Sequence, residues 1–291
     1  GATMTHAEKL EIAQMLDDMG VDIIEAGFPI ASEGDFEAVR DIAQQSRNAV
    51  ICGLARANVR DIDRCWEAVR HARRPRIHTF IGTSPLHRAI PNLDQDEMAE
   101  RIHETVTHAR NLCDNVQWSP MDATRTEWDY LRRVVEIAIR AGATTINIPD
   151  TVGYTAPRES ADLIRRLIAE VPGADAVVFA THCHNDLGMA TANALAAVEG
   201  GARQIECTIN GLGERAGNTA LEEVVMALRV RGDIMPFTTG IDTKKIMNIS
   251  RRVATVSGFQ VQPNKAIVGK NAFAHESGIH QDGMLKNAQT F

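Results

Sequence analysis

Short runs of apolar, often β-branched residues alternate with longer segments of helical periodicity along most of the chain. A first helix is predicted from Thr5 to Met19, with Thr5 and Glu8 in capping-box spacing. Seven strands are predicted after it, at residues 21–25, 49–54, 76–81, 115–119, 144–148, 176–182 and 204–209. A helix is predicted after each strand, near residues 33–45, 59–73, 95–113, 127–141, 158–170, 187–199 and 220–231.

Regular alternation of strands and helices favours a parallel sheet. Seven strands and one missing leading strand would give the eight strands of a (β/α)₈ TIM barrel. A doubly wound sheet is the weaker alternative, because no GxGxxG motif follows the first strand. We expect the barrel over residues 1–237. A truncated linker or the start of a subdomain is expected over 238–291, with a helix near 242–257 and a loop at 262–289.

The two ends of the sequence suggest a part of a longer protein. A helix pattern starts almost at residue 1, before any strand, and residue 1 is not methionine. The last residues are a polar stretch with no closing element. We therefore expect the first barrel strand to lie upstream of this chain.

Composition and charge narrow the class of protein. Hydrophobic residues make up 44% and charged residues 24% of the 291 positions, enough for a large core. The net charge of −7 argues against a nucleic-acid-binding surface, although a local arginine cluster could still bind a phosphorylated cofactor. Five dispersed cysteines indicate reduced thiols and a cytoplasmic location. We expect no membrane segment and no signal peptide.

Polar residues gather at the predicted strand ends, where barrel active sites form. They are Glu25, Arg56, His78, Ser119, Asp122, Asn147, Asp150, Thr151, His182, His184, Asn185, Asn210, Glu214, Arg215 and Asn218.

The pair His182 and His184 is the sharpest feature. Residues two apart on a strand point to the same face, so the two imidazoles can bind one cation. The alternative is two solvated loop histidines. Asn218 ends a glycine-rich loop and either caps the next helix or gives an oxygen to the metal. Imidazole and amide ligands together suit Mg, Mn or Zn.

Other candidates remain open on the sequence alone. Glu25 is either the buried partner of an arginine or a site acid. Thr151 caps a helix or binds substrate, and His78 is a core or a pocket residue. His275 and His280 lie in a polar loop that is either surface or a proton-transfer element.

Several motifs together resemble the bacterial 2-isopropylmalate synthases, a group that also includes homocitrate synthase, citramalate synthase and hydroxymethylglutaryl-CoA lyase. The similarity extends along essentially the whole chain. The most specific motifs are HCHNDLG at 182–188, NGLGERAGN at 210–218, NKAIVG at 264–269 and HESGIHQDG at 275–283.

The resemblance implies a metal-dependent acyltransferase that condenses acetyl-CoA with 3-methyl-2-oxobutanoate, the first committed step of leucine biosynthesis. It implies a divalent metal (Mn, Mg or Zn) and a homodimer, with only small-molecule substrates as other partners. The implied metal ligands are His182, His184 and Asn218. The implied substrate pocket contains Ser119, Thr151 and His78, with Leu54 and Asn147 selecting the oxo acid. The implied catalytic residues are Glu25, Asp122 and His280, the last reaching a partner subunit.

Two departures from the family pattern affect these expectations. The family carries an Arg-Asp pair on its first barrel strand, which this chain lacks, so we expect the chain alone to bind metal weakly and to be inactive. Relatives often carry Ser-x-Glu-Asp where this chain has Met121 before Asp122. Either Asp122 or a histidine would then replace the missing carboxylate, or the role of that glutamate is dispensable. The alternatives are a citramalate or homocitrate synthase and an inactive metal-binding fragment.

Overall fold

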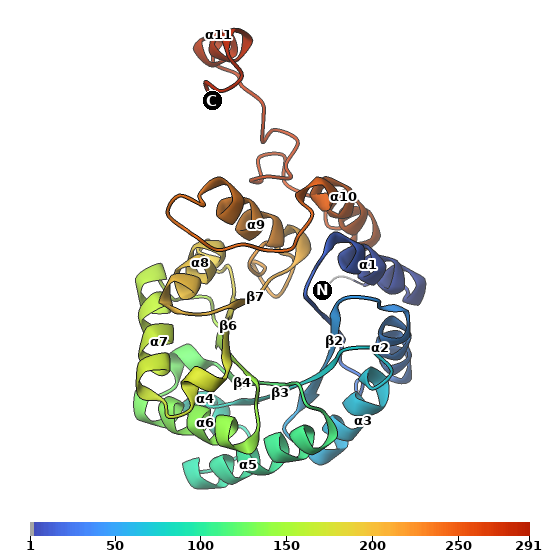
Figure 1. The fold of residues 1–291 in the computed structure, drawn as a ribbon, viewed down its shortest axis with the longest axis vertical. Helices are drawn as coiled ribbons and strands as arrows, with labels where there is room; N and C mark the ends of the chain where they lie inside the picture. The colour runs from blue at the N-terminus through green and yellow to red at the C-terminus, as the bar shows by residue number, and fades with distance from the viewer. Residues whose placement is uncertain (1–2) are drawn as a thin grey trace.

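The computed structural model describes residues 3–291, and its centre is one curled sheet of seven parallel strands in chain order. The strands are β1 (Ile23–Gly27), β2 (Val50–Arg56), β3 (Pro75–Gly82), β4 (Val116–Met121), β5 (Thr145–Asp150), β6 (Val178–Cys183) and β7 (Gln204–Glu206). Figure 1 shows the strands curving around a central axis with the helices outside. Within the described residues β1 and β7 do not pair with each other. The predicted barrel architecture with seven strands is therefore confirmed.

Helices cover the outer face of the sheet, except the last helix of the chain, which lies away from it (Figure 1). They are α1 (His6–Met19), α2 (Glu33–Gln45), α3 (Val59–Val69), α4 (Pro85–Ala89), α5 (Gln95–Leu112), α6 (Trp128–Ala141), α7 (Pro157–Glu170), α8 (Ala190–Gly200), α9 (Leu221–Val230), α10 (Ile246–Ser257) and α11 (Gly278–Lys286). The predicted capping box of α1 is present: the Thr5 hydroxyl accepts from the Glu8 amide, and the Glu8 carboxylate accepts from the Thr5 amide.

Three elements differ from the sequence prediction. β7 ends at Glu206 rather than residue 209, because Thr208 bonds to the later segment at Thr219 and residues 209–211 form a short 3₁₀ turn. A five-residue helix, α4, follows β3 with Ser84 as its N-cap. The region 262–289, predicted as loop, contains α11. This helix buries no residue, and its sequence has no amphipathic pattern by which it could have been predicted.

The main core lies between the sheet and its helices. Its largest fully buried side chains include Trp118, Ile77, Met98, Leu131 and Ile146. The inside of the curled sheet is polar instead. At the end of the sheet where the strands begin, the Arg76 guanidinium donates to Gln117 Oε1 at 2.8 Å and to Gln204 Oε1 at 2.9 Å. Apolar packing outside and hydrogen bonding inside together fix the positions of the strands.

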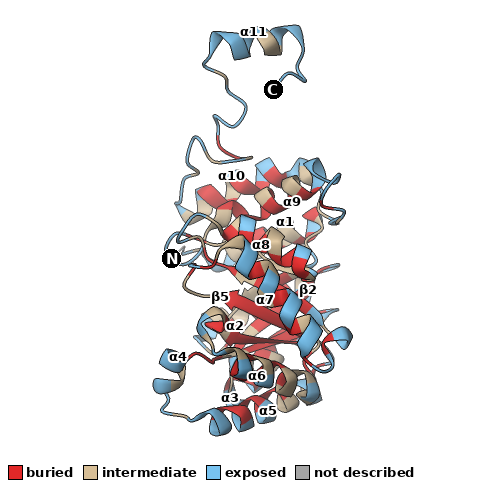
Figure 2. Cartoon of the chain, turned by 90° about the vertical axis from the view of Figure 1, so that its left-hand side faces the viewer, coloured by how far each residue is buried: buried red, intermediate tan, exposed pale blue. Residues whose placement is uncertain are grey.

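The C-terminal region begins packed on the barrel and ends away from it. α10 packs against α1, with Ile249 and Val253 beside Ile12 in one apolar cluster. After α10, Val268 is still buried in the same cluster. Beyond it the chain extends as an arm, residues 270–291, that carries α11 away from the sheet (Figures 1 and 2). Phe273 and Leu285 on this arm are more than four-fifths exposed, so the end of the arm is not covered by the described part of the chain.

Candidate active site

A continuous series of hydrogen bonds crosses the inside of the curled sheet. Glu25 Oε2 on β1 accepts from His78 Nδ1 on β3 at 2.8 Å. The other ring nitrogen, His78 Nε2, lies 2.6 Å from Ser119 Oγ on β4, and Asn147 Nδ2 on β5 donates to that hydroxyl at 2.9 Å. The structure thus brings together four residues that the sequence placed at separate strand ends.

The pKa of His78 depends on its contact with Glu25. Burial by itself lowers the pKa of the ring, but the charge and hydrogen bond of Glu25 outweigh burial and leave this pKa above its ordinary value. His78 is 5% exposed, whereas the Glu25 side chain is 39% exposed. The carboxylate is therefore the member of this pair that solvent reaches.

Glu206 on β7 connects this series to the histidine pair. Its Oε1 accepts from Asn147 Nδ2 at 3.1 Å and from His182 Nδ1 at 3.0 Å, and its Oε2 accepts from Gln117 Nε2 at 2.9 Å. Burial raises the pKa of Glu206, but the hydrogen bond and charge of His182 outweigh burial and lower it to about 2. Glu206 is thus a carboxylate held inside the barrel by donors from three strands.

The two histidines face each other with their Nε2 atoms, which are 2.9 Å apart. His182 Nδ1 is bound to the Glu206 carboxylate, and His184 Nδ1 lies 2.6 Å from the Thr151 carbonyl oxygen. Both oxygens can only accept, so each favours a proton on the Nδ1 atom that it faces, and with neutral rings two Nε2 lone pairs then point at one place. The Arg215 guanidinium, which can only donate, also lies 3.0 Å from His184 Nδ1. Only a cation or a shared proton makes this approach favourable.

The pKa values of the two rings shift in opposite directions. Burial lowers the pKa of both. At His182 the hydrogen bond to Glu206 and the charge of that carboxylate outweigh burial and raise the pKa, whereas at His184 the neighbouring His182 adds to burial and lowers it. The lowered pKa of His184 favours the neutral ring, which is the form that binds metal.

Asn218 fits beside the histidine pair. It forms an isolated antiparallel bridge with His184. Its Oδ1 atom is buried and accepts no hydrogen bond within residues 3–291. A Cβ at position 213 would overlap this oxygen, which explains glycine there. The amide oxygen of the residue paired with His184 and the two Nε2 atoms are together ligand types that fit a divalent cation.

Four other predicted residues have side chains outside this series of hydrogen bonds. Asp122 is fully buried; burial raises the pKa of its carboxyl, but ion pairing at 2.8 Å with Arg125 outweighs it and lowers the pKa. The Thr151 hydroxyl accepts from the Asp122 amide at 2.9 Å. Leu54 is half-buried and pairs in register with His78. His280 lies on α11, its ring 4.2 Å from that of Phe291, on the arm.

Sequence reasoning missed Glu206 and Gln117. Both lie within predicted strands rather than at their ends. The signal that could have found Glu206 is a carboxylate in the middle of the strand 204–209, which needs a partner if its side chain points inward.

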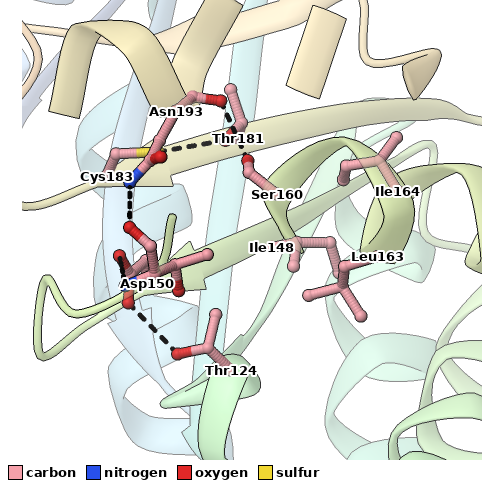
Figure 3. A pocket seen from close by; sticks show the side chains of 10 residues that line it. Thr124, Ile148, Asp150, Ser160, Leu163, Ile164, Thr181, Cys183 and Asn193 are labelled. Carbon is pink, nitrogen blue, oxygen red and sulfur yellow. Dashed lines mark hydrogen bonds between the residues drawn. The ribbon is translucent and has the colours of Figure 1, made fainter. Parts of the chain in front are cut away.

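An enclosed cavity of about 10 Å³ lies apart from the histidine pair, between strands β5 and β6 and helices α7 and α8 (Figure 3). Its volume is about that of one water molecule. The side-chain oxygens Thr155 Oγ1 and Asn193 Oδ1 line it, and both are buried without a hydrogen-bond partner. The cavity suits a structural water and is too small for a substrate.

Comparison with known families identifies the class of this fold and site. Residues 1–253 match the HMGL-like family, and residues 267–291 match the homocitrate synthase post-HMGL domain-like family. The chain therefore belongs to the HMGL-like family. Its fold is similar to that of an HMG-CoA lyase from Acinetobacter baumannii, solved in complex with coenzyme A and 3-methylmalate. The TM-score is 0.76, with 21% identity and coverage of 94% of this chain and 92% of the lyase.

Curated relatives of higher sequence identity share a narrower name. The chain is 65% identical over 292 aligned residues to the 2-isopropylmalate synthase of Bradyrhizobium sp. (strain ORS 278). It is 63% identical to that of Caulobacter vibrioides (strain NA1000 / CB15N). Each alignment covers 100% of this chain but 56% of the relative, so the chain spans about half the length of these enzymes. No helix among residues 3–291 is long and apolar enough to cross a membrane.

Proposed function

We propose that the chain provides the catalytic barrel of a 2-isopropylmalate synthase, a transferase that condenses acetyl-CoA with 3-methyl-2-oxobutanoate and then hydrolyses the thioester. The observation that carries the proposal is 61–65% identity to enzymes of this name over the whole chain. The polar series between β1 and β7 supports it, because carboxylate, imidazole, hydroxyl and amide groups come together at one end of the barrel, where the active sites of this fold form. The barrel would occupy residues 1–237, with the linker over 238–291.

His182, His184 and Asn218 would hold a divalent metal, with Mn, Mg and Zn as the candidates. When bound, such a cation would polarise the oxo-acid carbonyl as a Lewis acid. Glu206 and the Thr151 carbonyl would hold the two rings by their Nδ1 protons. This arrangement keeps both Nε2 lone pairs directed at the same point before any ligand binds.

The acetyl methyl group must lose a proton to attack the oxo acid. Glu25 is suited to accept it, because its carboxylate is 39% exposed and is held by His78, which can share the proton. Asp122 would contribute to proton transfer less directly, since its carboxylate is already paired with the Arg125 guanidinium. His280 would assist proton transfer in the site of a partner subunit, in a homodimer that the exposed arm would join.

The oxo acid would lie among Ser119, Asn147, Thr151 and His78. Leu54, in register with His78, offers an apolar contact that suits a branched aliphatic chain better than a second carboxylate. This contact favours 3-methyl-2-oxobutanoate over pyruvate and 2-oxoglutarate. A biosynthetic role and five free cysteines in the described chain support a cytoplasmic location.

The proposal is tested with the complete enzyme that contains this chain, acetyl-CoA and Mn²⁺. Release of free coenzyme A thiol is followed with 3-methyl-2-oxobutanoate, pyruvate or 2-oxoglutarate as the second substrate. The highest kcat/KM is expected with 3-methyl-2-oxobutanoate. A preference for pyruvate would make the protein a citramalate synthase, and one for 2-oxoglutarate a homocitrate synthase. Absence of thiol release with all three would overturn the condensing activity.

A further inference from the structure

A second group of ligand-type side chains lies on the first three strands, apart from the histidine pair. Glu25, Cys52 and His78 each place one donor atom in it, and these atoms all lie within 4.8 Å of one another. Glu25 and Cys52 are direct partners across β1 and β2, and the strand next to Cys52 supplies His78. Parallel pairing of three successive strands therefore produces the cluster, and the register between β1 and β2 shifts directly after Glu25.

The spacing of the donor atoms is close to that of a coordination shell. Cys52 Sγ is 3.9 Å from Glu25 Oε2, and His78 Nδ1 is 2.8 Å from the same oxygen. Ligands about 2.0–2.3 Å from a tetrahedral ion lie roughly 3.3–3.8 Å apart. Moving the flexible Glu25 carboxylate outward by less than 1 Å, about the difference between these spacings, would open the His–Glu contact enough to admit an ion.

The surroundings of His78 already support a ligand role. Its Nε2 atom lies 2.6 Å from the Ser119 hydroxyl, which can accept a hydrogen bond from a protonated Nε2 and so leave Nδ1 free for a cation. Cys52 and His78 are 1% and 5% exposed, while Glu25 opens to solvent. An ion would thus enter past Glu25, and water would complete its shell on that side.

We propose that Glu25, Cys52 and His78 form a binding site for a soft divalent cation, Zn²⁺ or Cd²⁺, separate from the one at His182 and His184. Sulfur, nitrogen and oxygen together favour these ions over Mg²⁺ or Mn²⁺. Burial and the Glu25 charge raise the pKa of the Cys52 thiol, so it is protonated before binding. Binding breaks the S–H bond, forms the S–metal bond and releases the proton to solvent.

The consequence for catalysis rests on the proposed function. Glu25 and His78 are also the residues that would accept the methyl proton and line the oxo-acid pocket. A soft cation held by both would remove the base and occupy the pocket. Zn²⁺ at this site would therefore inhibit the enzyme by competing with the oxo acid, whatever metal His182 and His184 hold.

The test uses Cd²⁺ alone, because a cadmium–thiolate bond gives an ultraviolet charge-transfer band that a histidine–amide site does not. In the wild-type protein the absorbance of this band is expected to saturate at one Cd²⁺ ion per chain. The band should be lost in C52S and retained in C65S, which alters an equally buried thiol beside the cluster. E25Q, at a partly exposed position that is expected to keep the fold, should weaken Cd²⁺ binding about tenfold or more.

The outcomes separate this proposal from the proposed function. A band that persists in folded C52S, or no band in the folded wild-type protein, would overturn the soft-cation site whether or not the enzyme condenses oxo acids. H182A should keep the band, because the proposed site is separate from the histidine pair; loss of the band in folded H182A would overturn that separation. Thermal unfolding of each variant checks that the fold is present. The binding measurement needs no substrate, so a failure of the condensation assay leaves it intact.

Discussion

Replacing Glu206 with glutamine tests whether this carboxylate organises the inside of the barrel. E206Q keeps the side-chain shape but removes the charge and turns one acceptor into a donor. In the wild-type protein the carboxylate accepts from Asn147, His182 and Gln117. If the glutamine oxygen faces His182, its NH₂ group faces the NH₂ group of Gln117.

Gln117 cannot turn to relieve this contact without cost. Its own oxygen accepts from Arg76 at 2.8 Å and from Gln204 at 2.8 Å, and a flip of the amide would break both bonds. One buried donor therefore stays unsatisfied, which costs about 1–3 kcal/mol. The charge-assisted bond from His182 also weakens. Together these changes should lower the free energy of unfolding by about 2–3 kcal/mol.

Urea unfolding followed by circular dichroism measures this loss. E104Q, an exposed change on α5, is the matched control and should stay within about 0.5 kcal/mol of the wild type. E206Q should also bind Mn²⁺ about 10–100-fold more weakly by calorimetry, because His182 loses the partner that holds its Nδ1 proton. Unchanged stability and Mn²⁺ affinity in folded E206Q would refute the central role of Glu206.

The pH dependence of E206Q gives an independent check. The folded protein holds the pKa of Glu206 at about 2, below the ordinary value of 4.5. Its stabilising contribution is therefore fully present above pH 4.5 and is lost as the pH falls toward 2. The stability gap between wild type and E206Q should be widest above pH 4.5 and should narrow toward pH 2. A gap that stays constant between these values would contradict the assignment.

Three further changes have defined outcomes. G200A should lower the unfolding free energy by about 1–3 kcal/mol, because its Cβ would overlap a backbone carbonyl of α7; G34A, in open space, should be nearly neutral in thermal unfolding. N218A should change stability little but weaken Mn²⁺ binding roughly tenfold or more in calorimetry; unchanged affinity would remove Asn218 from the ligands. K265M should cost about 3 kcal/mol in urea unfolding, because Lys265 pairs at 3.3 Å with the buried Glu222, and adding E222Q should restore part of the loss.

The barrel could be predicted from the sequence because short apolar runs of strand length alternate regularly with longer segments of helical periodicity. The predicted α2 agrees with the structure at both ends, since Ser32 caps its start and its apolar stripe ends at Ala43, two residues before the last helical residue Gln45. The end of β7 could not be predicted, because the residues after Glu206 are as apolar as a strand. There the chain leaves the sheet as Thr208 pairs with the later segment around Thr219, a tertiary contact.

Strand-end position predicted much of the candidate site. Glu25, His78, Ser119 and Asn147 share one series of hydrogen bonds because parallel strands bring their carboxyl ends together. The same rule also selected Asp122, but a local ion pair with an arginine three residues later occupies its carboxylate. Strand position thus indicates which residues are near the site but not which carboxylate is already paired.

The histidine pair shows where prediction from spacing stops. A separation of two residues places His182 and His184 on one side of the strand but leaves the rotation of each ring open. Glu206, 24 residues later, fixes one ring, and the Thr151 carbonyl, 33 residues earlier, fixes the other. The sequence therefore places two imidazole groups on one side of the strand. The orientation of each ring, which makes the two lone pairs point to one place, depends on the neighbouring residues Glu206 and Thr151. A variant that disturbs either neighbour should weaken metal binding even though both histidines remain.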